Sequence, residues 1–312
     1  MTEITIGADI SKDHIDLYSL PNGQTLKVAN DRKGFAAILK WIGTKRVVRI
    51  VYEPTGPYHK AFERFMMAQG VALSKVNPRL ARRFAEATGR LAKTDRIDAG
   101  LLARYGALLE PRILEGNSQI YNDLKELHVA RLALIKDRTA AKNREKNLSN
   151  PLLKKQNADR LRQIERQIKA VDEAIMSLVD EDETLRARFD ILVSIPGVSQ
   201  ITAFTLLIEM PELGELDEKA AAALSGLAPM SRQSGRWTGR AFIAGGRAIV
   251  RQALYMPALV ACRFNKDLKA NYDRLKAAGK PTKVAITAIM RKLIVLANAL
   301  LKNNRKWTPK PA

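Results

Sequence analysis

The stretch EITIGADISKDHIDLYSLPNGQTLKVA, residues 3–29, decides the fold class at the start of the chain. Residues 3–9, 14–20 and 25–29 each combine β-branched and apolar residues in a short run, as strands do. The Pro-Asn-Gly sequence at 21–23 is a turn signal. The chain therefore opens with three consecutive short strands.

The segments that follow alternate between helix and strand patterns. Apolar residues from Phe35 to Trp41 recur at helical spacing, and RVVRIVYE at 46–53 is the strongest strand signal in the chain. A helix is expected over 58–69, and VALSKV at 71–76 predicts another strand. This order predicts an α/β domain built on a mixed sheet.

The middle of the chain, about 118–188, has almost no strand signal. Six apolar residues step by 3-4-3-4-3, which is a heptad seam: Leu161, Ile164, Ile168, Val171, Ile175 and Leu178. The Ser-Asn-Pro sequence at 149–151 separates this segment from a weaker upstream pattern. We expect an antiparallel coiled-coil hairpin, which acts as a spacer, as a dimerisation arm, or as both.

The last part of the chain is predicted to be mostly helical. LVSIPGVSQITAFTLLIEM at 192–210 has the pattern of a helix-hairpin-helix element, whose turn at Gly197 can present backbone amides to a phosphate. A plain helical hairpin is the alternative. We expect domains at 1–117, 118–188 and 189–304, followed by a tail at 305–312.

Composition points to a nucleic-acid partner. The 312 residues include 53 Lys and Arg against 32 Asp and Glu, a formal net charge of +21. We find neither a run of about 18 apolar residues nor a signal peptide, so we expect a cytoplasmic protein without a membrane partner. A single cysteine, Cys262, excludes an internal disulfide, and the three histidines are scattered. Any metal site must therefore use oxygen ligands.

Four acids are candidates for such a site. Asp9 ends the first strand and Glu53 ends the strongest one, and groups at strand ends project into the crevice where ligands bind. Asp95 and Asp98 lie one helical turn apart and therefore share a face. Together these acids would form an all-oxygen site suited to magnesium or manganese, as in enzymes that move phosphodiester bonds.

Each acid also has a structural interpretation. Asp9 starts a turn in which Asp13 and Asp16 are competing acids. Glu53 precedes a proline and needs no function at a strand end. Asp95 follows a threonine that can cap the helix, where an acid is favoured by the helix dipole.

A second candidate site lies at 231–251, SRQSGRWTGRAFIAGGRAIVR, which has no acid and four glycines. Ser234 lies among five arginines expected to bind phosphate: Arg232, Arg236, Arg240, Arg247 and Arg251. The serine is either a nucleophile on a phosphodiester or only a hydrogen-bond donor in a phosphate-binding loop. Composition alone favours the second interpretation, a serine that only donates a hydrogen bond to phosphate.

Several motifs resemble the DEDD transposases of bacterial insertion sequences, the IS110 family. They are GADISKDHIDLYSL, VYEPTGPYHK, VNPRLARRFAEATGRLAKTDRIDAGLLARY, SIPGVSQITAFTLLIEM and GLAPMSRQSGRWTGRAFIAGGRAIVRQALYMPALVA. The resemblance extends from about residue 5 to 302, and the hairpin is its least distinctive part.

The resemblance implies a RuvC-like, ribonuclease-H-type N-terminal domain that binds magnesium through four acids. They correspond to Asp9, Glu53, Asp95 and Asp98, with Lys93 as a flanking residue expected to contact nucleic acid. It also implies that Ser234, in an S-G signature, attacks the DNA backbone and forms a covalent phosphoserine intermediate.

The resemblance further implies partners: double-stranded DNA at the element ends and the target, a structured guide RNA encoded by the element, and a homodimer that pairs into a tetramer. Two other functions remain open at this point. One is a RuvC-like junction-resolving nuclease without a covalent step, and the other is a basic nucleic-acid-binding protein without catalysis.

Overall fold

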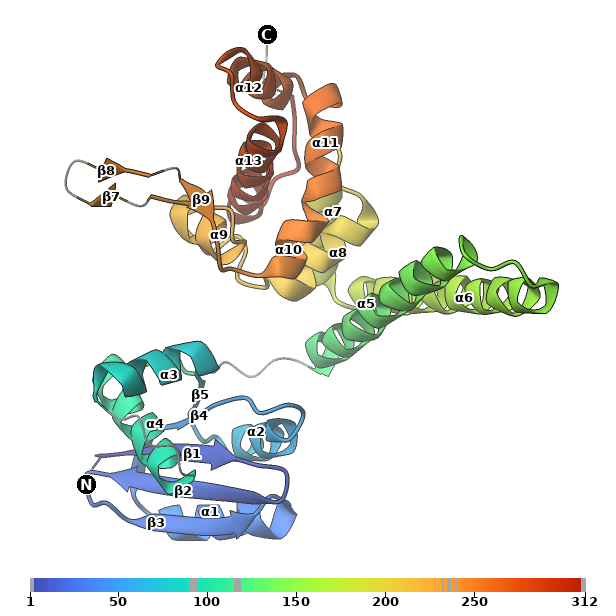
Figure 1. Ribbon diagram of the computed structural model, residues 1–312. Helices are drawn as coiled ribbons and strands as arrows, with labels where there is room; N and C mark the ends of the chain where they lie inside the picture. The colour runs from blue at the N-terminus through green and yellow to red at the C-terminus, as the bar shows by residue number, and fades with distance from the viewer. Residues whose placement is uncertain are drawn as a thin grey trace. The chain divides into compact units, whose positions relative to one another are not determined.

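The structure, a computed structural model, describes residues 3–89, 95–114, 119–231, 233–234, 237–239 and 241–309, without the side chains of 95–97, 233–234 and 237–238 (Figure 1). The chain divides into two compact units, Met1–Gly116 and Asn117–Ala312. Each unit is described separately below.

Unit 1 is an α/β domain, as the alternating pattern predicts. Its elements are β1 (Glu3–Ile10), β2 (His14–Leu20), β3 (Thr25–Ala29), α1 (Arg32–Ile42), β4 (Arg46–Tyr52), α2 (His59–Ala68), β5 (Leu73–Lys75), α3 (Pro78–Ala87) and α4 (Asp95–Leu109). The sheet order is β3-β2-β1-β4-β5. β1, β2 and β3 pair antiparallel, whereas β4 is parallel to β1 and β5 is parallel to β4. The strand predicted at 71–76 is shorter in the structure, where it extends only over Leu73–Lys75.

Helices cover both faces of this sheet (Figure 1). One face carries the even-numbered apolar residues of β1, which form a buried core with α1 and α2. The other face packs against α3 and α4, where Val51, Leu102 and Tyr105 belong to a second, smaller core. Alternation along β1 thus commits its odd-numbered residues to the α4 face.

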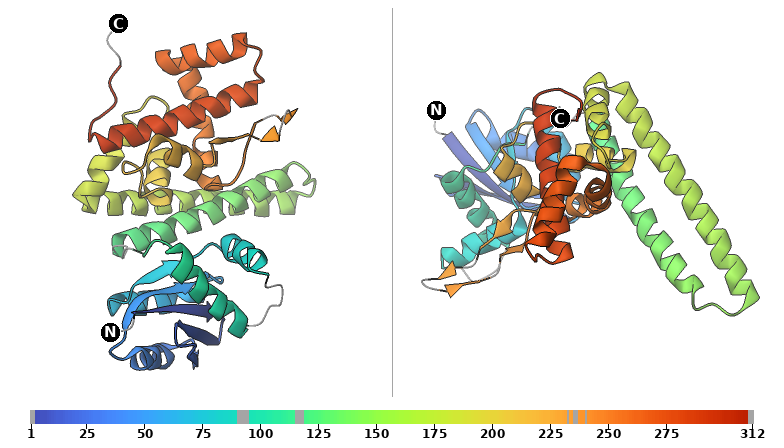
Figure 2. Two further views of the ribbon diagram at one scale, coloured as in Figure 1. Left: turned by 90° about the vertical axis from the view of Figure 1, so that its left-hand side faces the viewer. Right: turned by 90° about the horizontal axis from the view of Figure 1, so that it is seen from above.

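Unit 2 begins with two long helices, α5 (Gln119–Glu145) and α6 (Pro151–Glu181), which lie side by side as an antiparallel hairpin (Figure 2, right). The turn falls where Ser-Asn-Pro predicts it, and the Asn150 side chain caps α6 by accepting from the Leu152 amide. Three residues of the predicted seam, Ile164, Ile168 and Ile175, are buried. We call this hairpin the arm.

The rest of unit 2 is mostly helical, as predicted. Its helices are α7 (Glu183–Val193), α8 (Gln200–Glu209), α9 (Glu218–Leu224), α10 (Ala248–Ala253), α11 (Tyr255–Phe264), α12 (Lys266–Ala277) and α13 (Thr282–Lys302). They share one apolar core with the base of the arm, where Leu124, Ile175 and Val179 are buried.

Helix α13 is long and apolar enough, by length and composition, to cross a membrane. It is a core helix of unit 2, in which Ile289, Leu293 and Ile294 are fully or almost fully buried against its neighbours. Arg291 and Lys292 interrupt its apolar sequence. The helix is accounted for by packing within the unit.

The prediction that the last part of the chain is mostly helical missed one feature. A β-ribbon of two successive strand pairs interrupts the helices: β6 (Pro229–Met230) pairs with β9 (Phe242–Ile243), and β7 (Gln233–Ser234) pairs with β8 (Trp237–Thr238), both antiparallel. The ribbon projects from the helices of its unit (Figures 1 and 2). Its strands of two residues are too short for a periodic sequence signal.

Candidate active site

The first two candidate acids lie at neighbouring strand ends in unit 1. β1 and β4 are parallel, and the last pair in their register is Ala8 with Tyr52. Asp9 and Glu53 follow these two residues directly, and both are partly buried. Because the carboxyl ends of parallel neighbours meet at one edge of the sheet, the two acids belong to the same edge.

Helix α4 crosses this part of the sheet in direct backbone contact. A Cβ atom on Gly7 would lie 1.9 Å from the Ala99 carbonyl oxygen and 2.4 Å from the Ala103 nitrogen. Farther along the helix, a Cβ on Gly106 would lie 2.9 Å from Cγ2 of Thr5, two residues before Gly7 on β1. The helix therefore advances toward the amino ends of the strands, and its own N-terminal turn lies over their carboxyl ends.

The second pair of acids lies at the start of this helix. Asp95 and Asp98 occupy the first turn of α4, and Asp9 is the second-last residue of β1. Side chains alternate along a strand, so Asp9 shares the α4 face with the glycine two residues before it. Glu53 shares that face with the valine two residues before it. The backbone thus assigns Asp9 and Glu53 to the sheet face that α4 covers, and the first turn of α4 contains Asp95 and Asp98.

The structure describes the side chains of only three of the four acids. Asp98 is partly buried, but the side chain of Asp95 lies outside the described residues, as do Lys93 and Thr94. Among the side chains that are described, no group of three or more His, Cys, Asp and Glu residues could hold a metal ion. A metal site formed by these four acids therefore stays a prediction.

Asp16, one of the competing acids, lies next to this site. It is the register partner of Asp9 on β2 and therefore shares its face. Its carboxylate pairs with Lys27 Nζ at 3.4 Å, from the directly opposite position on β3. The Lys27 ammonium group thus compensates the negative charge of Asp16.

Asn30 braces the two loops that follow the strand-end acids. Its side-chain amide donates to the Ser11 carbonyl at 2.8 Å and to the Tyr58 carbonyl at 3.1 Å. Ser11 follows Asp9, and Tyr58 closes the loop that begins at Glu53. One side chain thus fixes both loops, a role that the sequence does not signal because Asn after a strand is an ordinary turn residue.

A polar network anchors the opposite face of β4. The Tyr52 hydroxyl donates to Glu63 of α2, which also pairs with Lys75 Nζ at 2.7 Å. Burial raises the pKa of Tyr52 well above its usual range, and the hydrogen bond to Glu63 adds to this. Burial also lowers the pKa of His59, whose ring packs near Tyr52. These contacts hold the residue that precedes Glu53.

In unit 2, Ser234 is the last residue of β7 and pairs with Trp237 of β8. The projecting ribbon therefore carries this serine away from the helical core (Figure 1). At the base of the ribbon, Met230, Phe242 and Ile243 have more than a third of their surface exposed. Three of the five candidate arginines lie outside the described residues: Arg232, Arg236 and Arg240.

The other two candidate arginines bind within the protein. Arg247 donates from Nη1 to the Glu209 carbonyl at 2.6 Å and pairs through Nη2 with Glu212 Oε1 at 2.6 Å. Arg251 donates to the Gly245 carbonyl at 2.9 Å. Both guanidinium groups thus fix the return of the ribbon to the helices.

The turn between α7 and α8 also packs inward. Gly197 has φ of +95°, and a Cβ there would lie 2.9 Å from the Pro257 carbonyl oxygen of α11. The positive φ and the close approach both require glycine. The predicted helix, Pro-Gly turn and apolar helix are present, and phosphate binding by Gly197 stays a prediction.

The end of α8 connects the arm to the ribbon. Lys125 of α5 pairs with Glu209 at 2.6 Å, and the Tyr121 hydroxyl donates to the Ile208 carbonyl. His128 is fully buried, with neither ring nitrogen hydrogen-bonded and Nε2 3.7 Å from Glu209 Oε1. Burial lowers the pKa of His128 more than the Glu209 carboxylate raises it.

Two family models match the chain. The model of an IS110-type DEDD transposase matches residues 6–150, and that of the transposase IS116/IS110/IS902 family matches residues 189–273. The region matched by the first model includes the sheet edge with Asp9 and Glu53, and the region matched by the second includes the ribbon with Ser234. The chain is therefore a DNA transposase or recombinase.

Similar proteins give the same result. The chain is 30% identical over 325 residues to the pilin gene-inverting proteins of Moraxella bovis and Moraxella lacunata, covering 98% of each sequence. It is 29% identical over 143 residues, 42% of this chain and 35% of the relative, to the insertion element IS900 uncharacterized 42 kDa protein of Mycobacterium paratuberculosis. Among solved structures, T. thermophilus RuvC in complex with a Holliday junction substrate is similar over 36% of this chain and all of that chain, at 11% identity and a TM-score of 0.28. The chain belongs to the IS110 family of transposases.

Proposed function

We propose that this transposase cuts and rejoins DNA through a covalent phosphoserine at Ser234, with a divalent cation held by Asp9, Glu53, Asp95 and Asp98. Unit 1 is then a RuvC-like domain, with which its mixed sheet is compatible. The packing of α4 on Gly7 supports the metal site of this proposal, because it is compatible with a first turn of α4 near the end of β1 that contains Asp9.

The chemistry of the four acids fits a hard divalent cation. Carboxylate oxygens are the preferred ligands of magnesium and manganese, and two strand ends plus one helical turn would supply four carboxylates. A cation bound there would neutralise charge on a scissile phosphate. The N-terminal end of α4 adds a partial positive charge on the same side.

The serine supplies the nucleophile. As Ser234 Oγ bonds to phosphorus, the bond from phosphorus to the leaving oxygen of the cut strand breaks, and the serine proton ends on that oxygen. In the second step a hydroxyl of the receiving strand attacks the phosphoserine, and its proton returns to Ser234. Arginines beside the serine would stabilise the charge on the phosphorus centre.

The remaining features of the proposal concern partners. We propose double-stranded DNA at the element ends and the target as substrate, a structured guide RNA, and a dimer that pairs into a tetramer on DNA. We place the protein in the bacterial cytoplasm. The net charge of +21 supports phosphate-rich partners in general and does not distinguish RNA from DNA.

A denaturing gel tests the covalent step. The protein is incubated with labelled element-end DNA, the element's structured RNA and magnesium, and we expect a protein-DNA adduct that Ser234→Ala abolishes and the neighbouring Ser231→Ala retains. Metal-dependent cutting that survives Ser234→Ala would overturn the proposal in favour of a junction-resolving nuclease that uses water. Each variant is first checked for an unchanged thermal unfolding curve.

A further inference from the structure

We propose that the distal half of the arm, residues 136–169, binds the phosphate backbone of double-stranded DNA. We call this segment the arm tip. The proposal rests on the membership of the chain in a family of DNA transposases. It does not depend on the chemistry at Ser234.

Charge is strongly segregated along the arm. The arm tip contains eleven Lys and Arg and four Asp and Glu, whereas the remainder of α5 and α6 contains two Lys and Arg and six Asp and Glu. A solvated helical hairpin needs no such separation, because mixed charges along both helices serve solubility equally well. The separation indicates that the two halves meet different surroundings.

The seam of the arm tip is closed within the chain. Arg138 pairs with Glu165 across the two helices at 3.5 Å, and the buried Asn157 donates to the Ala141 carbonyl at 3.1 Å. Ile164 is buried between the helices. The seam therefore needs no partner helix, and the surface that remains is polar and cationic.

Seven cations of the arm tip have no acidic partner, although the structure describes the whole arm. They are Lys136, Arg144, Lys146, Lys154, Lys155, Arg160 and Arg166. Their charges are available to an anionic ligand. The two exposed leucines of the arm tip, Leu152 and Leu153, immediately precede two of these lysines.

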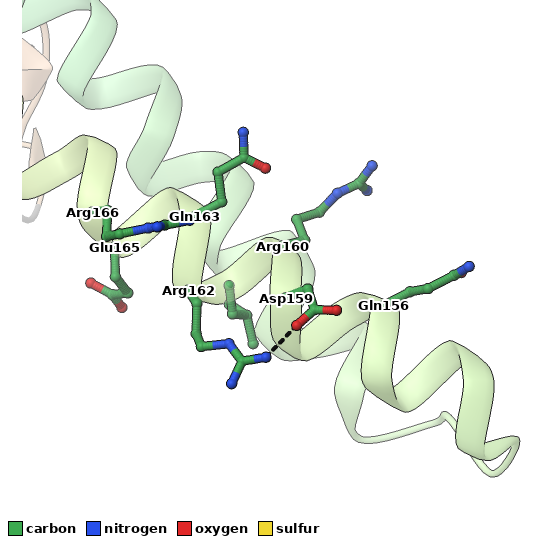
Figure 3. Close-up of a pocket in the computed structure, with 8 residues that line it drawn as sticks. Gln156, Asp159, Arg160, Arg162, Gln163, Glu165 and Arg166 are labelled. Carbon is green, nitrogen blue, oxygen red and sulfur yellow. Dashed lines mark hydrogen bonds and ion pairs between the residues drawn. The ribbon is translucent and has the colours of Figure 1, made fainter.

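Side chains of α6 are arranged to meet such a ligand (Figure 3). Gln156, Arg160 and Gln163 follow helical spacing and project on the same side of the helix. They line an open hollow together with Arg166, whereas Arg162 is held by Asp159. The two acids of the hollow are paired with other cations, Asp159 with Arg162 and Glu165 with Arg138 and Lys142, so the amide and guanidinium groups can meet phosphate and sugar oxygens.

Size and charge favour duplex DNA as the occupant. The distal part of α6, residues 151–169, is about 28 Å long, close to the 34 Å of one helical turn of DNA. Duplex DNA presents roughly one phosphate charge per 1.7 Å of its axis. The acidic base of the arm repels this polyanion, which confines the contact to the arm tip.

Salt-dependent binding tests the proposal. The affinity of the full chain for a duplex without element sequences is measured by fluorescence anisotropy over a range of KCl concentrations, with a chelator to prevent cutting. The variant replaces Lys154, Lys155, Arg160 and Arg166 by Gln. Four lost phosphate contacts should reduce the slope of log K against log salt by about 3 to 4.

A matched control removes four exposed cations elsewhere in unit 2, replacing Lys266, Lys280, Lys283 and Lys302 by Gln. It has the same net charge as the arm variant, so it reports the long-range effect of charge alone. We expect a clearly smaller change of slope than in the arm variant. Unfolding curves and the mass of each DNA-free protein in light scattering are measured alongside.

Three results would overturn the proposal. Equal slopes for the arm variant and the control would show that the arm tip makes no phosphate contacts. A changed DNA-free mass with an unchanged DNA slope would assign the surface to a second copy of the chain. Weakened binding to a structured RNA at an unchanged duplex slope would assign it to RNA. A missing adduct at Ser234 would leave all of these readings unaffected.

Discussion

Gly7 of β1 lies directly beneath the Ala99 carbonyl of α4, so close that a Cβ atom on the glycine would stand 1.9 Å from that oxygen. No side chain fits between the strand and the helix at this point. The contact sets the height of α4 above the sheet. It therefore sets the distance between the helix's first turn, with Asp95 and Asp98, and the strand end with Asp9.

Gly7→Ala tests the importance of this contact. Because the obstructing atom belongs to the helix backbone, α4 must move away from the sheet, and we expect unit 1 to lose about 1–3 kcal/mol of unfolding free energy. Strand transfer should fall by far more than the loss of folded protein explains. Both quantities are measured on the same preparation, by urea unfolding and by a gel assay.

Gly100→Ala is the matched control on the same helix. An added Cβ there would meet the Tyr18 ring at 3.7 Å, an ordinary contact. Replacing a helical glycine by alanine should leave stability unchanged or raise it by up to about 1 kcal/mol. Equal losses of strand transfer in the two variants would contradict the role given to the Gly7 contact.

Asn30→Ala should loosen the edge of the sheet. It removes two hydrogen bonds that fix the Ser11 and Tyr58 carbonyls, each worth about 0.5–1.5 kcal/mol. Because these loops follow Asp9 and Glu53, we expect the magnesium concentration for half-maximal strand transfer to rise. A titration of activity against magnesium measures this.

Asn22→Ala serves as the comparison, because Asn22 is exposed and bonds only to nearby Gln24. It should leave the magnesium requirement unchanged. If Asn30→Ala lowers stability but also leaves that requirement unchanged, the residue supports folding only and does not position the acids.

Arg247→Gln distinguishes a structural from a phosphate-binding arginine. The change breaks the contacts to the Glu209 carbonyl and to Glu212, so we expect unit 2 to lose about 1–3 kcal/mol. The salt slope of duplex binding should stay unchanged, because the guanidinium is already engaged. The exposed Arg305, replaced by Gln, should leave stability unchanged. An unchanged stability with a reduced slope for Arg247→Gln would restore the sequence-based interpretation.

His128 should make unit 2 sensitive to acid. Its pKa in the folded protein is lowered by burial and by Lys125 and Arg131, while Glu209 and Asp172 oppose the shift. Below the ordinary histidine pKa of about 6.5, the unfolded chain takes up a proton that the folded chain refuses. Stability therefore falls as the pH decreases below about 6.5, by at most roughly 1.4 kcal/mol per pH unit.

The variant His128→Leu should remove this component. The measurement is urea unfolding between neutral pH and mildly acidic pH. His14→Gln, at an exposed position, should retain the wild-type dependence. If His128→Leu keeps the wild-type dependence of stability on pH, protonation of His128 does not destabilise the folded state.

The sequence predicts most elements of unit 1 because their patterns are local. Strand alternation identifies β1 and β2, and in unit 2 the equally local heptad seam identifies α6 together with its buried isoleucines. The order of strands in the sheet is not local, so the pairing of Asp9 with Glu53 at one edge follows only from the register of β1 and β4.

The sequence does not reveal contacts that depend on distant partners. Arg247 reads as a phosphate ligand because its neighbours are glycine and arginine, yet its guanidinium binds residues 209 and 212 of the chain. Asn30 reads as a turn residue, although it connects two loops far apart in sequence. The ribbon that carries Ser234 is built from strands too short for any periodicity.

Manganese binding tests the central claim most directly. Electron paramagnetic resonance counts manganese bound to the DNA-free protein, and we expect each of Asp9→Asn, Glu53→Gln, Asp95→Asn and Asp98→Asn to weaken binding at least tenfold, a difference of about 1.4 kcal/mol. Asp13→Asn and Glu86→Gln, at exposed positions in the same unit, should bind as the wild type does. Wild-type binding by Asp98→Asn would contradict the account, because the first turn of α4 would then contribute nothing to the site at the end of β1.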